Sequence, residues 1–195
     1  MLFRSRRIEL ACDTTQRAPN IDSLIAQMSS ESRASITARE RLKKIGPGVV
    51  EPVAAAIAQN PYASQVLVAL GEASVAALMR LVEESSDSKV RERAMAALAE
   101  IGSPRAAPVY LRGLSDASPA IRESSIKGIG AVGDPRHIEM LISMLRDPKQ
   151  ESLWPDVATV LGEWGDPRAT DSLLRILDDQ TLPDLQRMCA MWALG

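Results

Sequence analysis

The stretch Gly102-Ser103-Pro104-Arg105 decides the fold, because nearly the same four residues return at Gly133-Asp134-Pro135-Arg136 and at Gly165-Asp166-Pro167-Arg168. The spacings are 31 and 32 residues. In each tetrad the glycine can end one helix in a left-handed conformation, the Ser or Asp can cap the next helix, and the proline suits its first turn. Each tetrad therefore predicts a tight turn between two antiparallel helices.

Apolar residues before each tetrad follow the period of a helix. Offsets of four, four and three residues trace one helical face, and they recur at Val90, Ala94, Leu98 and Ile101, at Ile121, Ser125, Ile129 and Val132, and at Leu153, Val157, Leu161 and Trp164. A second amphipathic segment follows each tetrad and ends in an acidic loop. The predicted unit is helix A, loop, helix B and tight turn, in about 31 residues.

The register extends in both directions. Ile45-Gly46-Pro47-Gly48 is a degenerate tetrad, and Gly71 and Gly195 match Gly162. We expect an all-α fold in which six hairpins (20–45, 46–71, 72–102, 103–133, 134–165 and 166–195) follow an N-terminal extension, residues 1–19. Gly195 aligns three residues before the next turn, which suggests a truncated chain or a missing C-terminal cap.

Residues 87–102 carry the resemblance to a known family, through Asp87, Val90, Arg91, Ala94, Ala97, Leu98, Ile101 and Gly102. This pattern resembles the HEAT-like repeat first associated with phycobilin lyases. The resemblance implies a right-handed α-α superhelix of the HEAT or armadillo type, with A helices on the convex face and B helices on the concave face. The family contains scaffolds, lyases and regulatory subunits, so the resemblance indicates the fold and not the function.

Composition narrows the class of protein. The net charge is -2, so the protein has no overall positive charge that would attract nucleic acid. Aromatic residues make up 3% of the chain, which favours helices packed closely through small side chains. Cys12 and Cys189 lie at opposite ends of the sequence, so we expect reduced thiols. No stretch approaches the roughly twenty apolar residues of a membrane span. These features predict a soluble, cytoplasmic protein without a membrane partner.

The surface of the B helices is the predicted partner-binding groove. Positions opposite the buried stripe are Glu92 and Ala96, Glu123 and Lys127, Pro155 and Thr159, and Met188 and Trp192. The expected contact residues for a protein or peptide partner are Trp154, Trp192, Lys127, Glu123 and Glu92. The alternative for Trp192, which lies near the end of the sequence, is that it covers a missing repeat. A neighbouring column is uniformly small, which predicts close approach of adjacent B helices at Ala99, Gly130, Gly162 and Gly195.

An arginine recurs at the start of helix B, at Arg91, Arg122 and Arg187. In HEAT-like units this arginine pairs with a loop acid, which here implies a ladder of Arg91 with Asp87 and Arg122 with Asp116 that ties successive repeats together. The alternative is a binding row for an acidic partner. Trp154 replaces the arginine in the fifth repeat, either as an interface residue at the groove edge or as a side chain folded over Leu153 and Pro155, and the ladder should stop there.

Catalytic and cofactor chemistry has little support. His137 is the only histidine, so a zinc or iron site lacks ligands; this also disfavours the HEAT-like deoxyhypusine hydroxylases, whose iron sites need several His-Glu pairs. No nucleophile motif or phosphate-binding loop is present. We expect no catalytic residue, metal or cofactor.

The sequence therefore favours a non-enzymatic scaffold that binds a protein along the concave groove, with the oligomeric state left open. One alternative is a bilin lyase-like or chromophore-binding protein. Another is nucleic-acid binding through the basic N-terminal end, at Arg33, Arg39, Arg41, Lys43 and Lys44, which is disfavoured because acidic residues follow in the later grooves.

Overall fold

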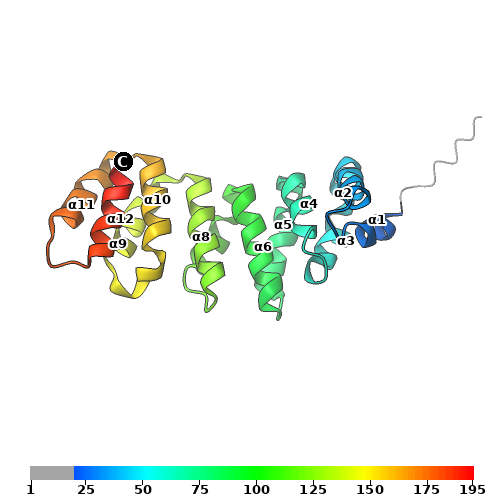
Figure 1. Cartoon of the computed structure of the whole chain (residues 1–195), viewed down its shortest axis with the longest axis horizontal. Coiled ribbons are helices and arrows are strands. Elements are labelled where there is room, and N and C mark those ends of the chain that lie inside the picture. The colour runs from blue at the N-terminus through cyan, green and yellow to red at the C-terminus, as the bar shows by residue number, and fades with distance from the viewer. Residues whose placement is uncertain (1–19) are drawn as a thin grey trace, which may run out of the picture.

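The computed structural model describes residues 20–195, and every regular element within them is a helix (Figure 1). The A helices are α1 (Ile21–Gln27), α3 (Val50–Ala55), α5 (Glu72–Glu84), α7 (Ala107–Gly113), α9 (Ile138–Arg146) and α11 (Pro167–Asp178). The B helices are α2 (Arg33–Ile45), α4 (Ala63–Leu70), α6 (Ser88–Ile101), α8 (Pro119–Val132), α10 (Trp154–Trp164) and α12 (Asp184–Leu194). Short 3-10 helices extend several of them: η1 (Gly46–Val49), η2 (Ala56–Ala58), η3 (Pro104–Ala106), η4 (Pro135–His137) and η5 (Pro148–Leu153). The predicted 1–19 extension lies outside the described residues.

The helices pair in chain order and the pairs stack in a row, which confirms the predicted all-α solenoid (Figure 1). We number the pairs repeats 1 to 6, from α1–α2 to α11–α12. Each B helix contacts the next one along the row, from α2 through α4, α6, α8 and α10 to α12. A single apolar core runs between the A and B layers through all six pairs. Repeats at the two ends of the row are therefore connected only through their neighbours.

The Gly-Ser/Asp-Pro tetrads form the predicted turns. Gly102, Gly133 and Gly165 have φ of 64°, 67° and 56°, in the left-handed region that favours glycine. The side chain that follows each glycine caps the next helical segment by accepting a backbone N–H, for example Asp166 Oδ1 from Arg168 N at 2.9 Å. The chain reverses sharply at each tetrad because both helix ends are satisfied within the turn.

Glycines in the small column allow close approach of the B helices. A Cβ atom on Gly130 would lie 2.7 Å from Cγ2 of Val160, and one on Gly162 would lie 3.1 Å from the carbonyl oxygen of Ala193. Close packing is thus confirmed at these two positions. At Gly195 the prediction stays untested, because the sequence ends at this residue and a Cβ there would meet nothing within 4 Å.

Arg91 and Arg122 bind main-chain oxygens, so the predicted pairing of these two arginines with Asp87 and Asp116 is wrong. Arg187, the third arginine of the row, instead donates to Gln180 Oε1 at 2.8 Å and to the carboxylate of Asp184. Arg91 donates to the carbonyl oxygens of Ser85 (3.1 Å) and Ser86 (3.4 Å), and Asp87 instead caps α6 by accepting from Lys89 N at 2.8 Å. These contacts join helix B to the loop of its own repeat. The arginine is long enough to pass the carboxylate, which is already engaged as a helix cap.

The same arrangement recurs one repeat later. Arg122 donates to the carbonyl oxygens of Asp116 (2.9 Å) and Ala117 (3.1 Å), while the Asp116 carboxylate accepts from Ser118 N at 2.8 Å. Contacts between repeats are made by other side chains. Arg93 donates to the carbonyl oxygens of Ile57 (2.7 Å) and Ala58 (3.0 Å) at the end of the helical segment before α4.

Candidate partner-binding surface

The exposed side of α6, α8, α10 and α12 forms one continuous surface, because these helices lie side by side (Figure 1). Ala96, Lys127, Thr159 and Trp192 occupy equivalent positions on the four helices, and all four are exposed. They lie opposite the buried stripe of each helix, as its 3.6-residue period requires. We call this surface the B face; its other members are Glu92, Glu100, Glu123, Pro155, Glu163 and Met188.

A hydrogen bond holds Glu92 at the junction of repeats 3 and 4. The hydroxyl of Ser118, the N-cap of α8, donates to Glu92 Oε1 at 2.6 Å. Glu92 is therefore only partly exposed, and one of its carboxylate oxygens is already used. A partner that contacts Glu92 would meet an oriented carboxylate and not a freely rotating one.

Three charged groups gather at the junction of α8 and α10. Lys127 Nζ lies 3.9 Å from Asp156 Oδ1, and Glu123 lies close enough to perturb the same carboxylate. Partial burial raises the pKa of Asp156 above its ordinary value, and Glu123 adds to the rise while Lys127 opposes it. Lys127 is the cation that balances two carboxylates here, and its side chain remains 63% exposed.

Trp154 is not part of this surface, which corrects the prediction that it contacts a partner. Its side chain is 1% exposed, and its indole Nε1 donates to the carbonyl oxygen of Met144 at 3.1 Å. The residue starts α10 from the end of η5, and this turn directs the ring between α9 and α10. Trp154 thus belongs to the core.

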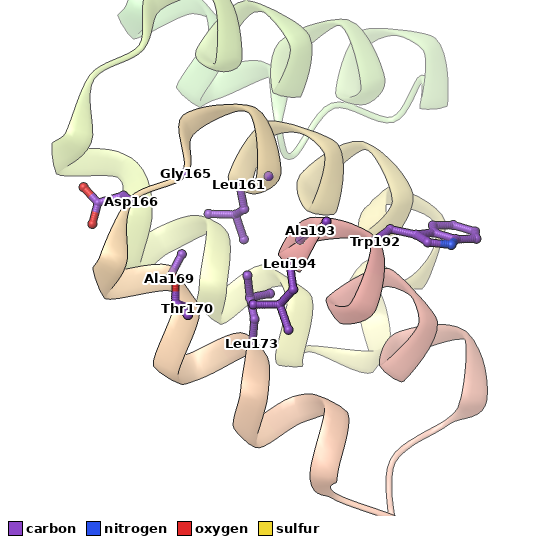
Figure 2. A pocket seen from close by; sticks show the side chains of 11 residues that line it. Leu161, Gly165, Asp166, Ala169, Thr170, Leu173, Trp192, Ala193 and Leu194 are labelled. Atoms are coloured by element: carbon purple, nitrogen blue, oxygen red, sulfur yellow. The ribbon is translucent and has the colours of Figure 1, made fainter.

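Trp192 is the large aromatic residue that the B face exposes. Its side chain is 55% exposed, and Met188, one turn earlier, is 43% exposed. Figure 2 shows the indole projecting away from Leu161 and Leu173, which line a cavity of about 260 Å³ beside the last turn of α12. An exposed indole next to a methionine is an apolar patch suited to binding a partner.

Two of the five basic residues of repeat 1 are engaged by other groups of the protein. Arg39 is buried, with its guanidinium 4.4 Å from the ring centroid of Tyr62 and a hydrogen bond to the carbonyl oxygen of Ser30. Lys43 is paired with Glu40 at 2.9 Å. The cation–π contact and the ion pair remove two of the five cations that the nucleic-acid interpretation needs.

A cavity of about 450 Å³ on the A-helix side was not expected from the sequence. Val109, Met95 and Ile121 line it, and an ion pair between Glu83 and Arg112 joins α5 to α7 beside it. In the aligned repeats α7 ends at Gly113, two residues earlier than α5 and α9 end, and no residue type in the sequence signals the cavity.

Residues 20–195, the part of the chain that the structure describes, contain no group of three or more His, Cys, Asp or Glu residues that could hold a metal ion. None of its helices combines the length and the apolar character needed to cross a membrane. Cys189 is a buried free thiol whose pKa is raised by burial; Cys12 lies outside the described residues.

The architecture and the open B face define a helical-repeat protein. The family model for HEAT repeats matches residues 75–154 and 107–195. The chain belongs to the HEAT-repeat family.

Three proteins are similar to this chain in sequence. It is 30% identical over 110 residues to deoxyhypusine hydroxylase of Gallus gallus and 30% identical over 100 residues to that of Rattus norvegicus, which covers 55% and 51% of this chain but only 37% and 33% of the relatives. It is 26% identical over 141 residues to an uncharacterized phycocyanin operon protein Z of Pseudanabaena tenuis, covering 68% of this chain and 69% of the relative. An engineered protein of known crystal structure aligns with 91% of the chain at 16% identity and a TM-score of 0.47.

Proposed function

We propose that the chain is a non-enzymatic, cytoplasmic scaffold that binds a protein or peptide partner along the B face. The observation that carries this proposal is the exposure of Trp192, an indole left 55% open on a surface that four successive helices share. Membership of the HEAT family supports it, because stacked repeats present extended surfaces for binding. The contact residues are Trp192, Lys127, Glu123 and Glu92.

The charge of the B face specifies the partner further. Glu92, Glu100, Glu123 and Glu163 supply four carboxylates, against which Lys127 is the cation at the centre. A partner that places an apolar side chain against Trp192 and basic side chains along α6 to α10 complements this pattern. Phosphate-rich nucleic acid would be repelled by the same carboxylates.

Variants of exposed residues test the proposal, because they leave the core intact. Affinity capture from lysate of the source organism should recover a specific partner, and Trp192→Ala should weaken its binding about tenfold or more. Lys127→Glu should change the association rate and its dependence on salt. The matched control is Leu111→Ala, which truncates a 38% exposed residue on the A-helix side. Equal partner binding by wild type, Trp192→Ala and Lys127→Glu would contradict the B face as the site.

A chromophore-binding function is the second candidate, supported by the alignment with the phycocyanin operon protein over about two thirds of both chains. Cavities of about 260 to 450 Å³ overlap the lower range of small-molecule sites. Mixing the protein with phycocyanobilin should then shift the visible absorbance of the pigment. An unchanged spectrum at micromolar protein removes this candidate and leaves the scaffold proposal untouched.

An enzymatic function similar to that of the two hydroxylase relatives is the third possibility to test. The alignment covers little more than a third of those proteins, and this sequence has a single histidine. We propose that the similarity lies in the repeat and not in the chemistry. Titration with iron(II) followed by calorimetry tests this: stoichiometric binding of the metal would contradict the non-enzymatic proposal.

A further inference from the structure

A cavity of about 230 Å³ lies between repeats 5 and 6, where helices α9 and α11 pack together and lead into their loops (Figure 1). It is bounded by the first turn of α12, at the opposite end of this helix from the last residues of the sequence. A cavity of this volume is smaller than the sites that hold drug-sized ligands. Its lining comes from α9, α11, the loop after α11 and α12, and consists of Arg146, Arg175, Ile176, Asp179, Leu182 and Gln186.

Gln186 is a polar residue in the buried apolar stripe of the B helices. The repeats can be aligned on the recurring arginine of helix B, which Trp154 replaces in repeat 5. The residue before it is then Val90, Ile121 or Leu153 in repeats 3 to 5, and Gln186 in repeat 6. All four side chains are buried, and Gln186 is only 1% exposed. A buried amide is costly unless its donor and its acceptor both have hydrogen-bond partners.

Only the donor half of the Gln186 amide has a partner. Its Nε2 donates to the carbonyl oxygen of Leu145, in the last turn of α9, at 2.6 Å. The orientation of the amide follows from this contact, because an oxygen in place of Nε2 would face another acceptor. The Oε1 atom is buried and has no hydrogen-bond partner among residues 20–195. Since Gln186 lines the cavity, a molecule held there can supply the missing donor.

Two arginines give the same cavity a positive charge. Arg146 and Arg175 line it, and neither forms an ion pair with an acid of the described chain. The junction of repeats 3 and 4 differs, because Arg112, which aligns with Arg175, is paired there with Glu83 at the end of α5. At the junction of repeats 5 and 6, the end of α9 supplies a second arginine instead. Guanidinium groups bind carboxylates through parallel hydrogen bonds, so this arrangement suits an anionic group.

Asp179 adds an ionised acid to the lining. The hydroxyl and the backbone N–H of Thr181 donate to Asp179 Oδ1 at 2.6 and 2.9 Å, and they hold the pKa of this carboxyl below its ordinary value. A fixed negative charge disfavours an anion of high charge and favours one that also carries a donor. The cavity thus offers two cations, one carboxylate and one amide acceptor, beside the apolar side chains of Ile176 and Leu182.

We propose that this cavity binds a small organic acid whose carboxylate is held by Arg146 and Arg175, and whose neighbouring carbon carries a donor for Gln186 Oε1. α-Hydroxy acids and α-amino acids share this chemistry, the first with a hydroxyl and the second with an ammonium group. The aliphatic part of either molecule would contact Ile176 and Leu182. The site uses none of the B-face residues, so it does not depend on the function proposed above.

Three ligands with one carbon skeleton test the proposal: L-lactate, L-alanine and propionate, which has the carboxylate but no donor. Each is titrated into the full chain to about 20 mM, which covers millimolar dissociation constants, and binding is followed by NMR at constant pH and ionic strength. L-lactate or L-alanine should bind saturably and shift the side-chain amide signal of Gln186. Propionate should bind about tenfold more weakly, because it leaves the buried Oε1 without a donor. The ligand that binds shows whether the donor is a hydroxyl or an ammonium group.

Four variants assign the binding to the cavity. Arg146→Gln and Arg175→Gln should each weaken the binding of L-lactate or L-alanine about tenfold or more. Arg112→Gln is the matched control, since it removes the equivalent arginine of repeat 4, outside the cavity. Gln186→Leu introduces the residue that repeat 5 has at this position, and it should reduce the binding of L-lactate or L-alanine to that of propionate.

Each outcome decides the proposal. Binding that both cavity arginines and Gln186 control, and that Arg112→Gln leaves unchanged, supports the site. The absence of saturable binding of both L-lactate and L-alanine within the titrated range overturns it. Equal affinity for propionate also overturns it, as does equal weakening by Arg112→Gln and Arg175→Gln. Far-UV circular dichroism checks the helices of each variant. Arg146 and Arg175 are exposed, so their variants keep the test valid even if Gln186→Leu does not fold.

Discussion

The indole nitrogen of Trp154 hydrogen-bonds to the carbonyl oxygen of Met144, 3.1 Å away at the end of α9. In repeat 3 the guanidinium of Arg91 at the equivalent position reaches the carbonyl oxygen of Ser85, just after α5, at the same distance. Tryptophan and arginine thus perform one task, because each extends an N–H donor to the main chain where helix A ends. The row of donors continues through repeat 5, contrary to the expectation that Trp154 interrupts it.

Replacement of Trp154 should therefore affect stability and not partner binding. Trp154→Phe removes the N–H and part of the ring, and we expect it to lower the free energy of unfolding by about 1–3 kcal/mol. Urea denaturation followed by circular dichroism measures this. Partner binding by the folded Trp154→Phe variant should match the wild type, in contrast to Trp192→Ala. A loss of binding without a loss of stability would place Trp154 back at the interface.

Gly128 packs closely against the ring of Tyr110, and its substitution tests this contact. A Cβ atom on Gly128 would lie 2.5 to 2.7 Å from three carbon atoms of the buried Tyr110 ring. Gly128→Ala should therefore cost about 1–3 kcal/mol through overpacking, even though alanine favours helices. Gly48→Ala is the matched control, because its Cβ would meet nothing within 4 Å and its φ is not positive. Equal midpoints of thermal unfolding for the two variants would contradict the close approach.

Tyr110 links stability to alkaline pH. Burial raises the pKa of Tyr110 to about 12, so the neutral phenol is favoured in the folded state. The associated stability is fully present below the unfolded pKa near 10, and it is lost as pH rises through the folded pKa near 12. Tyr110→Phe should remove the part of the alkaline loss of stability that comes from ionisation of this phenol.

At neutral pH the same substitution should cost about 0.5–1.5 kcal/mol, because the hydroxyl no longer donates to the carbonyl oxygen of Leu98, 2.5 Å away. Thermal unfolding between pH 7 and 11.5 measures both effects. Parallel curves for wild type and Tyr110→Phe across this range would show that Tyr110 does not carry the linkage.

Lys127 should control the titration of Asp156. Burial already raises the pKa of Asp156, and Lys127 partly offsets the rise; Lys127→Met should therefore raise that pKa further. Carbon-detected NMR titration of the aspartate side chains measures the change. Because burial disfavours ionised Asp156, the neutral carboxyl is the form that the folded state favours. The stability associated with this neutral form is lost as pH rises through the folded pKa of Asp156. The free energy of unfolding of Asp156→Asn should therefore rise relative to that of the wild type between acidic and neutral pH.

Arg93 should couple repeat 3 to repeat 2. Its guanidinium binds the carbonyl oxygens of Ile57 and Ala58 across the repeat boundary, and charged hydrogen bonds of this kind contribute about 1–2 kcal/mol. In Arg93→Met, hydrogen exchange should accelerate in α1 to α4 more than in α8 to α12, since a solenoid transmits stability through neighbours. Arg80→Met is the control, because Arg80 forms an exposed ion pair with Glu51, and exposed ion pairs contribute little to stability. Uniform acceleration along the chain would argue against local coupling.

Local sequence signals were sufficient to predict the solenoid. The turn at Gly133-Asp134-Pro135 needs only a positive φ, a side-chain cap and a proline at the start of the next segment, all of which lie within a few consecutive residues. The offsets of Ile121 and Ile129 likewise report one helix face without reference to any other helix. Because the turns after repeats 3, 4 and 5 carry the same local signals, the stacking of these hairpins follows from the sequence alone.

Only the tertiary structure decided what the long side chains bind. Arg91 passes a nearby carboxylate to reach main-chain oxygens, Trp154 turns inward, and Arg39 is buried against Tyr62. These outcomes depend on atoms that other helices and loops bring close, which helix periodicity does not specify. Leu174 and Ile142 show the same dependence: they are equivalent in sequence, yet Leu174 is 44% exposed while Ile142 on α9, against which α11 packs, is 3% exposed.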